Sequence, residues 1–96
     1  MLVVVSYDVS TKTASGKKRL RKVAEICLDN GLRVQNSVFE CIVEPAQWES
    51  LKDQLLSIFK KEEDSLRFYF LGSNWQRRVE HHGKETNLNI EDLLII

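Results

Sequence analysis

The sequence has no long hydrophobic run. Its first apolar stretch, residues 2–5, follows no basic residue and is soon followed by the acid Asp8. A signal peptide carries positive charge before its apolar segment, and a membrane helix needs about 20 apolar residues. We therefore expect neither of them, and we expect a cytoplasmic protein with no membrane contact.

Cysteine is also scarce. Cys27 and Cys41 lie in apolar patterns and have neither a CxxC spacing nor companion histidines. This favours buried thiols over a disulfide or a metal pair. The adjacent His81 and His82 would face opposite sides of a strand, which argues against a shared metal ion.

Several motifs of phosphate and metal chemistry are absent. The sequence contains no GxxxxGK[ST] phosphate loop, no GxGxxG fingerprint and no HExxH helix. No serine or cysteine stands in a spacing that marks a nucleophile. The sequence therefore does not indicate a nucleotide-binding loop or a zinc hydrolase.

Net charge is missing as well, but the charges are unevenly placed. Residues 1–43 hold seven Lys/Arg and four Asp/Glu, which gives +3, whereas residues 44–96 hold seven and ten, which gives −3. A chain of 96 residues forms one domain with a single core. The first half of that domain is expected to be basic and the second half acidic.

Hydrophobic spacing predicts the order of the elements. Residues 2–8 form an apolar, β-branched strand, and residues 16–30 have helical spacing with Ser15 as the expected N-cap. Residues 33–43 are extended, with a turn expected at Asn36 and Ser37. A helix is expected to begin near Pro45, with Trp48 in its apolar stripe. Residues 60–64 are expected to form a charged, solvent-exposed segment after this helix, and residues 66–71 the next strand.

This β-α-β-β-α-β order predicts an α+β fold, a ferredoxin-like sandwich with two helices on one face of an antiparallel sheet. We assign residues 1–74 to this domain and residues 75–96 to a C-terminal segment that completes a dimer. Residues 79–82 are expected to form a short strand, and residues 90–96 an apolar strand.

A homodimer is expected because the first strand is apolar on both faces. Leu2 and Val4 point to one face, and Val3, Val5 and Tyr7 to the other. Two helices cover one face only, and the C-terminal strand can add to the sheet edge of a neighbouring subunit. The alternative is a monomer whose tail folds back over its own sheet.

Asp8 ends the first strand. A lone aspartate at a strand end is usually a turn residue, and one carboxylate is a poor Mg²⁺ site. A twofold axis near Asp8 would bring two carboxylates together, and a divalent ion between them could polarise a phosphoryl oxygen or activate water.

A basic cluster opens the first helix. Its side chains lie on the outer side of the helix, and no acid interrupts them. They form either a solvated helix face or a phosphate-binding face. Arg77 and Arg78 make a second, smaller candidate patch. The cluster consists of Lys12, Lys17, Lys18, Arg19, Arg21 and Lys22.

Three segments resemble a known family. The strand end Tyr7-Asp8, the helix at residues 18–23 (KRLRKV) and residues 31–40 (GLRVQNSVFE) are similar to CRISPR-associated protein two, Cas2. The similarity covers almost the whole chain. The stretch around Val79, Glu80 and His81 and the acidic segment near the C-terminus resemble the branch that accompanies type I-C systems.

The resemblance implies a ferredoxin-like homodimer in the cytoplasm that serves spacer acquisition, binds double-stranded DNA and a Cas1 (Cas-one) integrase, and cleaves DNA, RNA or both with Mg²⁺. It places the metal ligand at Asp8 and a catalytic role at Tyr7. It adds Arg19 and Arg33 as nucleic-acid-binding residues, and Ser37 and Phe39 as supporting ones. The type I-C branch favours duplex DNA.

Two hypotheses from different classes follow. In the first, paired Asp8 residues make the dimer a Mg²⁺-dependent endonuclease. In the second, the dimer is a non-catalytic scaffold that presents basic helices to DNA and bridges integrase dimers. A generic ferredoxin-like RNA-binding module is a third option, which lacks the expected aromatic signature.

Overall fold

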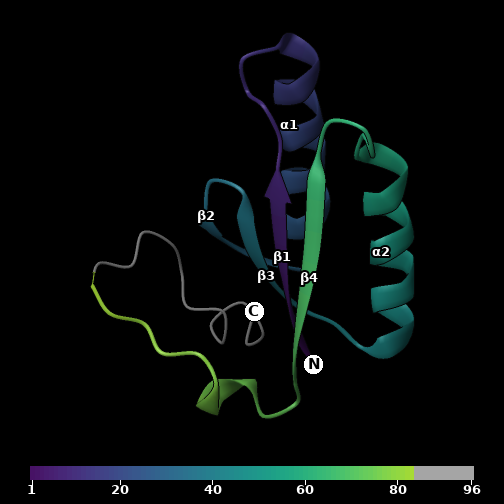
Figure 1. Cartoon of the computed structure of the whole chain (residues 1–96). Helices are drawn as coiled ribbons and strands as arrows, with labels where there is room; N and C mark the ends of the chain where they lie inside the picture. The colour runs from purple at the N-terminus through teal and green to yellow at the C-terminus, as the bar shows by residue number, and fades with distance from the viewer. Residues whose placement is uncertain (84–96) are drawn as a thin grey trace.

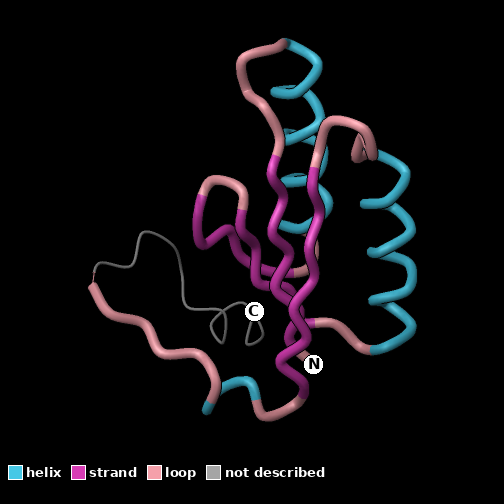
Figure 2. Tube along the Cα trace, viewed as in Figure 1, coloured by secondary structure: helices cyan, strands magenta, loops and turns pink. Residues whose placement is uncertain are grey.

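The computed structural model describes residues 1–83 of the chain. The strand predicted at residues 90–96 lies outside this range. Figures 1 and 2 show strands and helices running along a common direction. In chain order the elements are β1 (Leu2–Asp8), α1 (Ala14–Leu28), β2 (Gly31–Gln35), β3 (Val38–Ile42), α2 (Pro45–Ile58), β4 (Ser65–Gly72) and the 3₁₀ helix η1 (Trp75–Arg77).

The sheet has the order β2-β3-β1-β4, and every neighbouring pair is antiparallel. The predicted α+β, ferredoxin-like architecture is confirmed. The turn expected at Asn36 and Ser37 is also confirmed, because Gln35 pairs with Val38 across it. The division of the chain at residue 74 stays a prediction.

The core lies between one face of the sheet and the two helices. Val3, Val5 and Tyr7 of β1 are buried on this inner face, as the alternation of β1 predicts. The predicted stripe of α2 is buried at Trp48, which packs edge-on against Phe68 with ring centroids 4.7 Å apart. The core also contains Phe39 and Cys41 of β3, Leu20, Val23, Ala24 and Cys27 of α1, and Leu51 and Leu55 of α2. Both cysteines are free and buried, as predicted.

The opposite side of the sheet, here called the outer face, is only partly apolar. Leu2 is fully buried, Val4 and Ser6 are half-buried, and Asp8 is exposed. The strand pairing places further residues beside these four on the same face. They are Val38, Glu40 and Ile42 of β3 and Ser65, Arg67 and Tyr69 of β4.

The start of α1 corrects one prediction. Thr13, not Ser15, is the N-cap, because the Thr13 side chain accepts a hydrogen bond of 3.0 Å from the Gly16 N–H. A Cβ at Gly16 would lie 1.9 Å from the Ser10 carbonyl oxygen. Glycine therefore lets the loop after β1 pack against the first turn of the helix.

The segment after β4 corrects another prediction. Residues 75–77 form the 3₁₀ helix η1, and residues 79–82 have no regular secondary structure. The turn is closed by hydrogen bonds from the N–H groups of Arg78 and Val79 to the Trp75 carbonyl, at 2.9 and 3.1 Å. Within residues 1–83, no helix has the length and apolar character needed to cross a membrane.

Candidate functional site

Asp8 lies at the end of β1, on the outer face, with its side chain exposed. Its partner across the β1–β4 pairing is Ser65, the first residue of β4. Only residues 9–13 separate β1 from α1, so Asp8 and the start of α1 share one end of the molecule (Figure 1). The predicted metal ligand is thus accessible at the end that carries the basic cluster.

Arg67 is a neighbour of Asp8 that the sequence prediction missed. It pairs with Ser6, two residues before Asp8, and therefore lies diagonally across from Asp8 on the outer face. Its Nη1 is 3.3 Å from the Tyr69 hydroxyl, and this hydrogen bond raises the pKa of Arg67. Strand alternation places Arg67 and Tyr69 on one face, but only the register shows which β1 residues they meet.

Tyr7 points to the opposite face from Asp8, so the structure does not bring their side chains together. The Tyr7 side chain is buried, and its hydroxyl donates a hydrogen bond to Asp64 Oδ2. Burial and this hydrogen bond raise the pKa of Tyr7 to about 12. A catalytic role for Tyr7 stays a prediction. In the structure, Tyr7 fixes the strand end that carries Asp8.

Asp64 departs from the expectation that residues 60–64 form a charged, solvent-exposed segment after the second helix. Its side chain is fully buried and accepts two hydrogen bonds from the Arg19 guanidinium, at 2.8 and 3.0 Å, and one from the Lys60 N–H at 2.9 Å. Burial alone raises the pKa of Asp64, but the hydrogen bonds from Arg19, Tyr7 and Lys60 lower it to about 2. Asp64 precedes β4 and stands two residues before Leu66, which packs against the core, and this spacing could have predicted an inward side chain.

Arg19 differs from the rest of the basic cluster. In addition to the two hydrogen bonds that Arg19 donates to Asp64, its Nη2 atom lies 3.4 Å from Glu63 Oε2. The Arg19 side chain is 14% exposed. Its Nη1 donates to the Ser15 hydroxyl at 3.4 Å. The structure therefore places Arg19 in a network that joins α1 to the start of β4, and its role in nucleic-acid binding stays a prediction.

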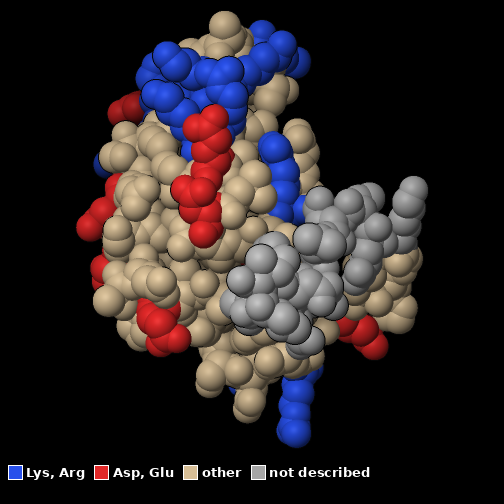
Figure 3. Space-filling model, turned by 180° about the vertical axis from the view of Figure 1, so that it is seen from behind, with Lys and Arg blue, Asp and Glu red and all other residues tan. Residues whose placement is uncertain are grey.

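The other predicted cations are exposed at the start of α1. Figure 3, which views the molecule from behind, shows Lys and Arg side chains gathered at this end. None of the five forms an ion pair with another residue in the range 1–83. We call these residues the basic face of α1: Lys12 of the preceding loop and Lys17, Lys18, Arg21 and Lys22 of the helix.

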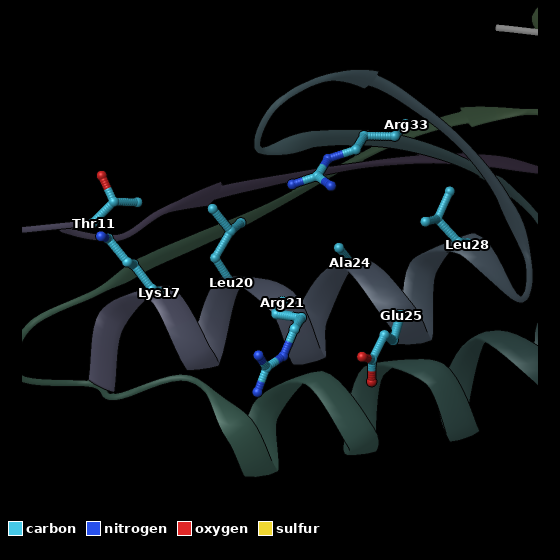
Figure 4. A pocket seen from close by; sticks show the side chains of 8 residues that line it. All are labelled: Thr11, Lys17, Leu20, Arg21, Ala24, Glu25, Leu28 and Arg33. Carbon is cyan, nitrogen blue, oxygen red and sulfur yellow. The ribbon is translucent and has the colours of Figure 1, made fainter. Parts of the chain in front are cut away.

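An open groove of about 350 Å³ lies beside the basic face of α1. Figure 4 shows Arg33 reaching from β2 over the side of α1 that carries Leu20 and Ala24. Lys17 and Arg21 contribute to its lining. The structure thus brings Arg33 to the basic face of α1, as a shared phosphate-binding surface requires. The remaining lining residues are Thr11, Glu25 and Leu28.

The two predicted supporting residues, Phe39 and Ser37, contribute to the packing and hydrogen bonding of the sheet. Phe39 is fully buried, and the Arg33 guanidinium lies 5.5 Å from the centre of its ring. Arg33 also donates to the Asn36 carbonyl at 2.8 Å. Ser37 accepts a hydrogen bond of 2.9 Å from the Tyr7 N–H through its carbonyl. Phe39 therefore contributes through its packing and Ser37 through its backbone, and a role for either in activity stays a prediction.

A divalent ion fits Asp8 only as part of a larger site. Within residues 1–83, no group of three or more His, Cys, Asp and Glu side chains lies together. Mg²⁺ is commonly held by one or two carboxylates and keeps several waters. An exposed carboxylate at a strand end can supply one such ligand, and a second copy of the chain can supply another.

The fold and the site together define a ferredoxin-like protein that presents a strand-end carboxylate beside a basic helix. Residues 1–79 match the family described as CRISPR associated protein Cas2. The chain belongs to this family, and the resemblance seen in the sequence is confirmed. The type I-C branch stays a prediction.

Relatives and solved structures agree with this membership. The chain is 55% identical to a "CRISPR-associated endoribonuclease Cas2" of Chlorobaculum tepidum over the full length of both chains. It is 54% identical to a "CRISPR-associated endonuclease Cas2" of Halalkalibacterium halodurans, covering 99% of each chain. The crystal structure of Streptococcus pyogenes Cas2 is 58% identical with a TM-score of 0.79, and the match covers 86% of this chain and 100% of that one.

Proposed function

We propose that this chain is a metal-dependent endonuclease of CRISPR adaptation, which cleaves phosphodiester bonds in double-stranded DNA, RNA or both. The observation that carries the proposal is an exposed Asp8 at the same end of the molecule as the basic face of α1, whose five cations form no ion pair within residues 1–83. Family membership supports it, because relatives that are more than half identical are named endonuclease or endoribonuclease.

The active unit is a homodimer. The outer face carries half-buried Val4, Val38 and Ile42 and the exposed ring of Tyr69, and no helix of residues 1–83 covers it. A second copy of this face would bury these apolar groups around a twofold axis. In the order β2-β3-β1-β4, β4 is an edge strand to which the C-terminal segment of a partner subunit can add.

Asp8 of each subunit is the proposed ligand of Mg²⁺. Once bound, Mg²⁺ would lower the pKa of a water and polarise a phosphoryl oxygen. Hydrolysis adds water across one P–O bond: an oxygen of water bonds to phosphorus, the leaving oxygen separates, and the proton of water ends on it or in solvent. Tyr7, held by Asp64, keeps the β1 end rigid so that Asp8 stays in place.

The basic face of α1 and Arg33 position the substrate. Lysine and arginine side chains neutralise backbone phosphates without reading the sequence. Since the groove joins Arg33 to Lys17 and Arg21, one backbone can follow it from α1 to β2. Spacer acquisition would then involve the Cas1 integrase as partner, in the cytoplasm.

One observation favours a second function. Within residues 1–83, Asp8 is the acid at the end of β1, whereas the basic face of α1 holds five cations that form no ion pair, so this part of the chain suits binding better than cleavage. In this alternative the dimer is a non-catalytic scaffold that holds DNA between Cas1 integrase dimers.

Replacing Asp8 by Asn tests the proposed function. We expect Asp8→Asn to abolish Mg²⁺-dependent cleavage of a labelled duplex, while duplex affinity in metal-free buffer is retained. Ser10→Ala, a nearby exposed position, is the matched control. Cleavage that survives Asp8→Asn contradicts the assignment. A wild-type protein that binds but never cleaves, while spacer acquisition in cells persists with Asp8→Asn, supports the scaffold instead.

A further inference from the structure

We propose that Arg67 is a substrate-binding residue of the Asp8 site and that it holds the phosphodiester group to be cleaved. The inference rests on the proposed nuclease function and adds the residue that binds the reacting phosphate. It comes from the β1–β4 register, which places Arg67 and Asp8 as diagonal neighbours on the outer face.

Arg67 is well placed for this role. Diagonal neighbours across an antiparallel pair lie about 7–8 Å apart at their backbones, within reach of a long side chain. That gap leaves room for a phosphate between the guanidinium and the carboxylate. Ser65, which lies directly opposite Asp8, is small and leaves the space open.

The charge pattern of the outer face singles out Arg67. Among the outer-face positions that the pairing of β1, β3 and β4 defines in residues 1–83, Arg67 is the one Lys or Arg. The basic face of α1 belongs to the helix layer on the other side of the sheet. A phosphate bound at the Asp8 end of the outer face, at the margin of the proposed contact with the second copy, therefore meets Arg67 as the one cation among these positions.

Tyr69 orients the guanidinium. The hydrogen bond of 3.3 Å joins Arg67 Nη1 to the Tyr69 hydroxyl and leaves the remaining N–H donors for a ligand. Within residues 1–83, Arg67 forms no ion pair, whereas the partly buried Arg19 forms one with Asp64. A guanidinium fork matches two phosphate oxygens, which an ammonium group cannot do.

The test compares Arg67→Gln and Arg67→Lys with Lys52→Gln. Lys52 lies on α2, in the helix layer, where it pairs with Glu49, and it serves as the control for loss of one positive charge. We expect Arg67→Gln to lower the cleavage rate at saturating duplex at least ~10-fold. Arg67→Lys should lower it less, and Lys52→Gln should leave it unchanged.

A second readout needs no metal. In metal-free buffer, Arg67→Gln should reduce the slope of log affinity against log salt by about 0.9, the value of one phosphate contact on duplex DNA. Arg67→Lys should keep that slope, because it keeps the charge. Light scattering and thermal unfolding of each variant establish its oligomeric state and folding.

The outcomes separate this inference from the function on which it rests. If Asp8→Asn is inactive and Arg67→Gln cleaves like the wild type, the inference is overturned while the nuclease stands. A smaller salt slope with an unchanged rate at saturation also overturns it, because Arg67 then contacts DNA away from the reacting phosphate. Loss of the dimer in Arg67→Gln would assign Arg67 to the subunit interface instead. Cleavage that persists in Asp8→Asn, or that the wild type lacks, rejects the proposed function and this inference with it.

Discussion

At the scale of single residues, Asp64 is a carboxylate whose hydrogen bonds outweigh the cost of its burial. A buried carboxylate is tolerated here because Arg19 meets it with a two-point hydrogen bond and Tyr7 and the Lys60 N–H complete its contacts. The result is a link between the end of β1, the first turns of α1 and the start of β4. Asp8 projects from the same strand end.

The lowered pKa of Asp64 sets a pH window for stability. The ionised form is favoured in the folded state, so its contribution is present above the ordinary pKa of 3.8 and is lost as the pH falls toward about 2. We expect Asp64→Asn to lower the free energy of unfolding by about 2 kcal/mol at pH 7. Urea unfolding from pH 7 down to pH 2 would measure this.

Glu63→Gln is the matched control for Asp64→Asn. Glu63 also contacts Arg19, but its side chain is 55% exposed and the contact is long, so the expected loss is below about 1 kcal/mol. An Asp64→Asn protein whose destabilisation is as large at pH 2 as at pH 7 would show that the loss is due to packing rather than to charge.

At the scale of elements, α1 combines two tasks. Its buried stripe, which includes Val23 and Cys27, fixes the helix on the sheet, while the basic face points to solvent. The sequence showed both stripes through their helical spacing. It did not show that Arg19, inside the basic run, faces Asp64, because that contact spans 45 residues of chain.

Charge reversal on α1 tests the basic face. We expect Lys18→Glu, Arg21→Glu and Lys22→Glu together to reduce the salt slope of duplex binding by roughly 2 to 3, since each phosphate contact contributes about 0.9. Titrations at several salt concentrations would measure this slope. Lys61→Glu, a charge reversal at an exposed site beyond α2, is the control and should change the slope little. An unchanged slope in the triple variant would reject the basic face as a DNA-binding surface.

At the scale of the whole molecule, the proposed function requires a second copy of the chain. Asp8 is an exposed carboxylate at the proposed centre, and within residues 1–83 it belongs to no group of three or more His, Cys, Asp and Glu side chains that could hold a metal ion. The half-covered outer face gives a physical reason for pairing, and a twofold axis would bring two Asp8 side chains to one end.

A purified heterodimer of one wild-type and one Asp8→Asn subunit tests this pairing. If both carboxylates hold one ion, the heterodimer should be nearly inactive. Two independent centres would give about half of the wild-type rate. Coexpression with two different affinity tags yields the heterodimer, cleavage of a labelled duplex gives the rate, and a tagged wild-type dimer controls for the tags. Half activity would contradict a shared ion.

The order of the elements, the buried cysteines, the hairpin turn and the family could be predicted from the sequence, because each depends on local spacing or on residues close in the chain. Strand alternation also predicted Asp8 at a strand end and on the opposite face from Tyr7. Contacts between distant residues could be seen only in the folded chain. The β1–β4 register brings Arg67 beside Asp8, and the packing of α1 buries Asp64 against Arg19. Such contacts join segments that are far apart in the chain, so no local pattern determines them.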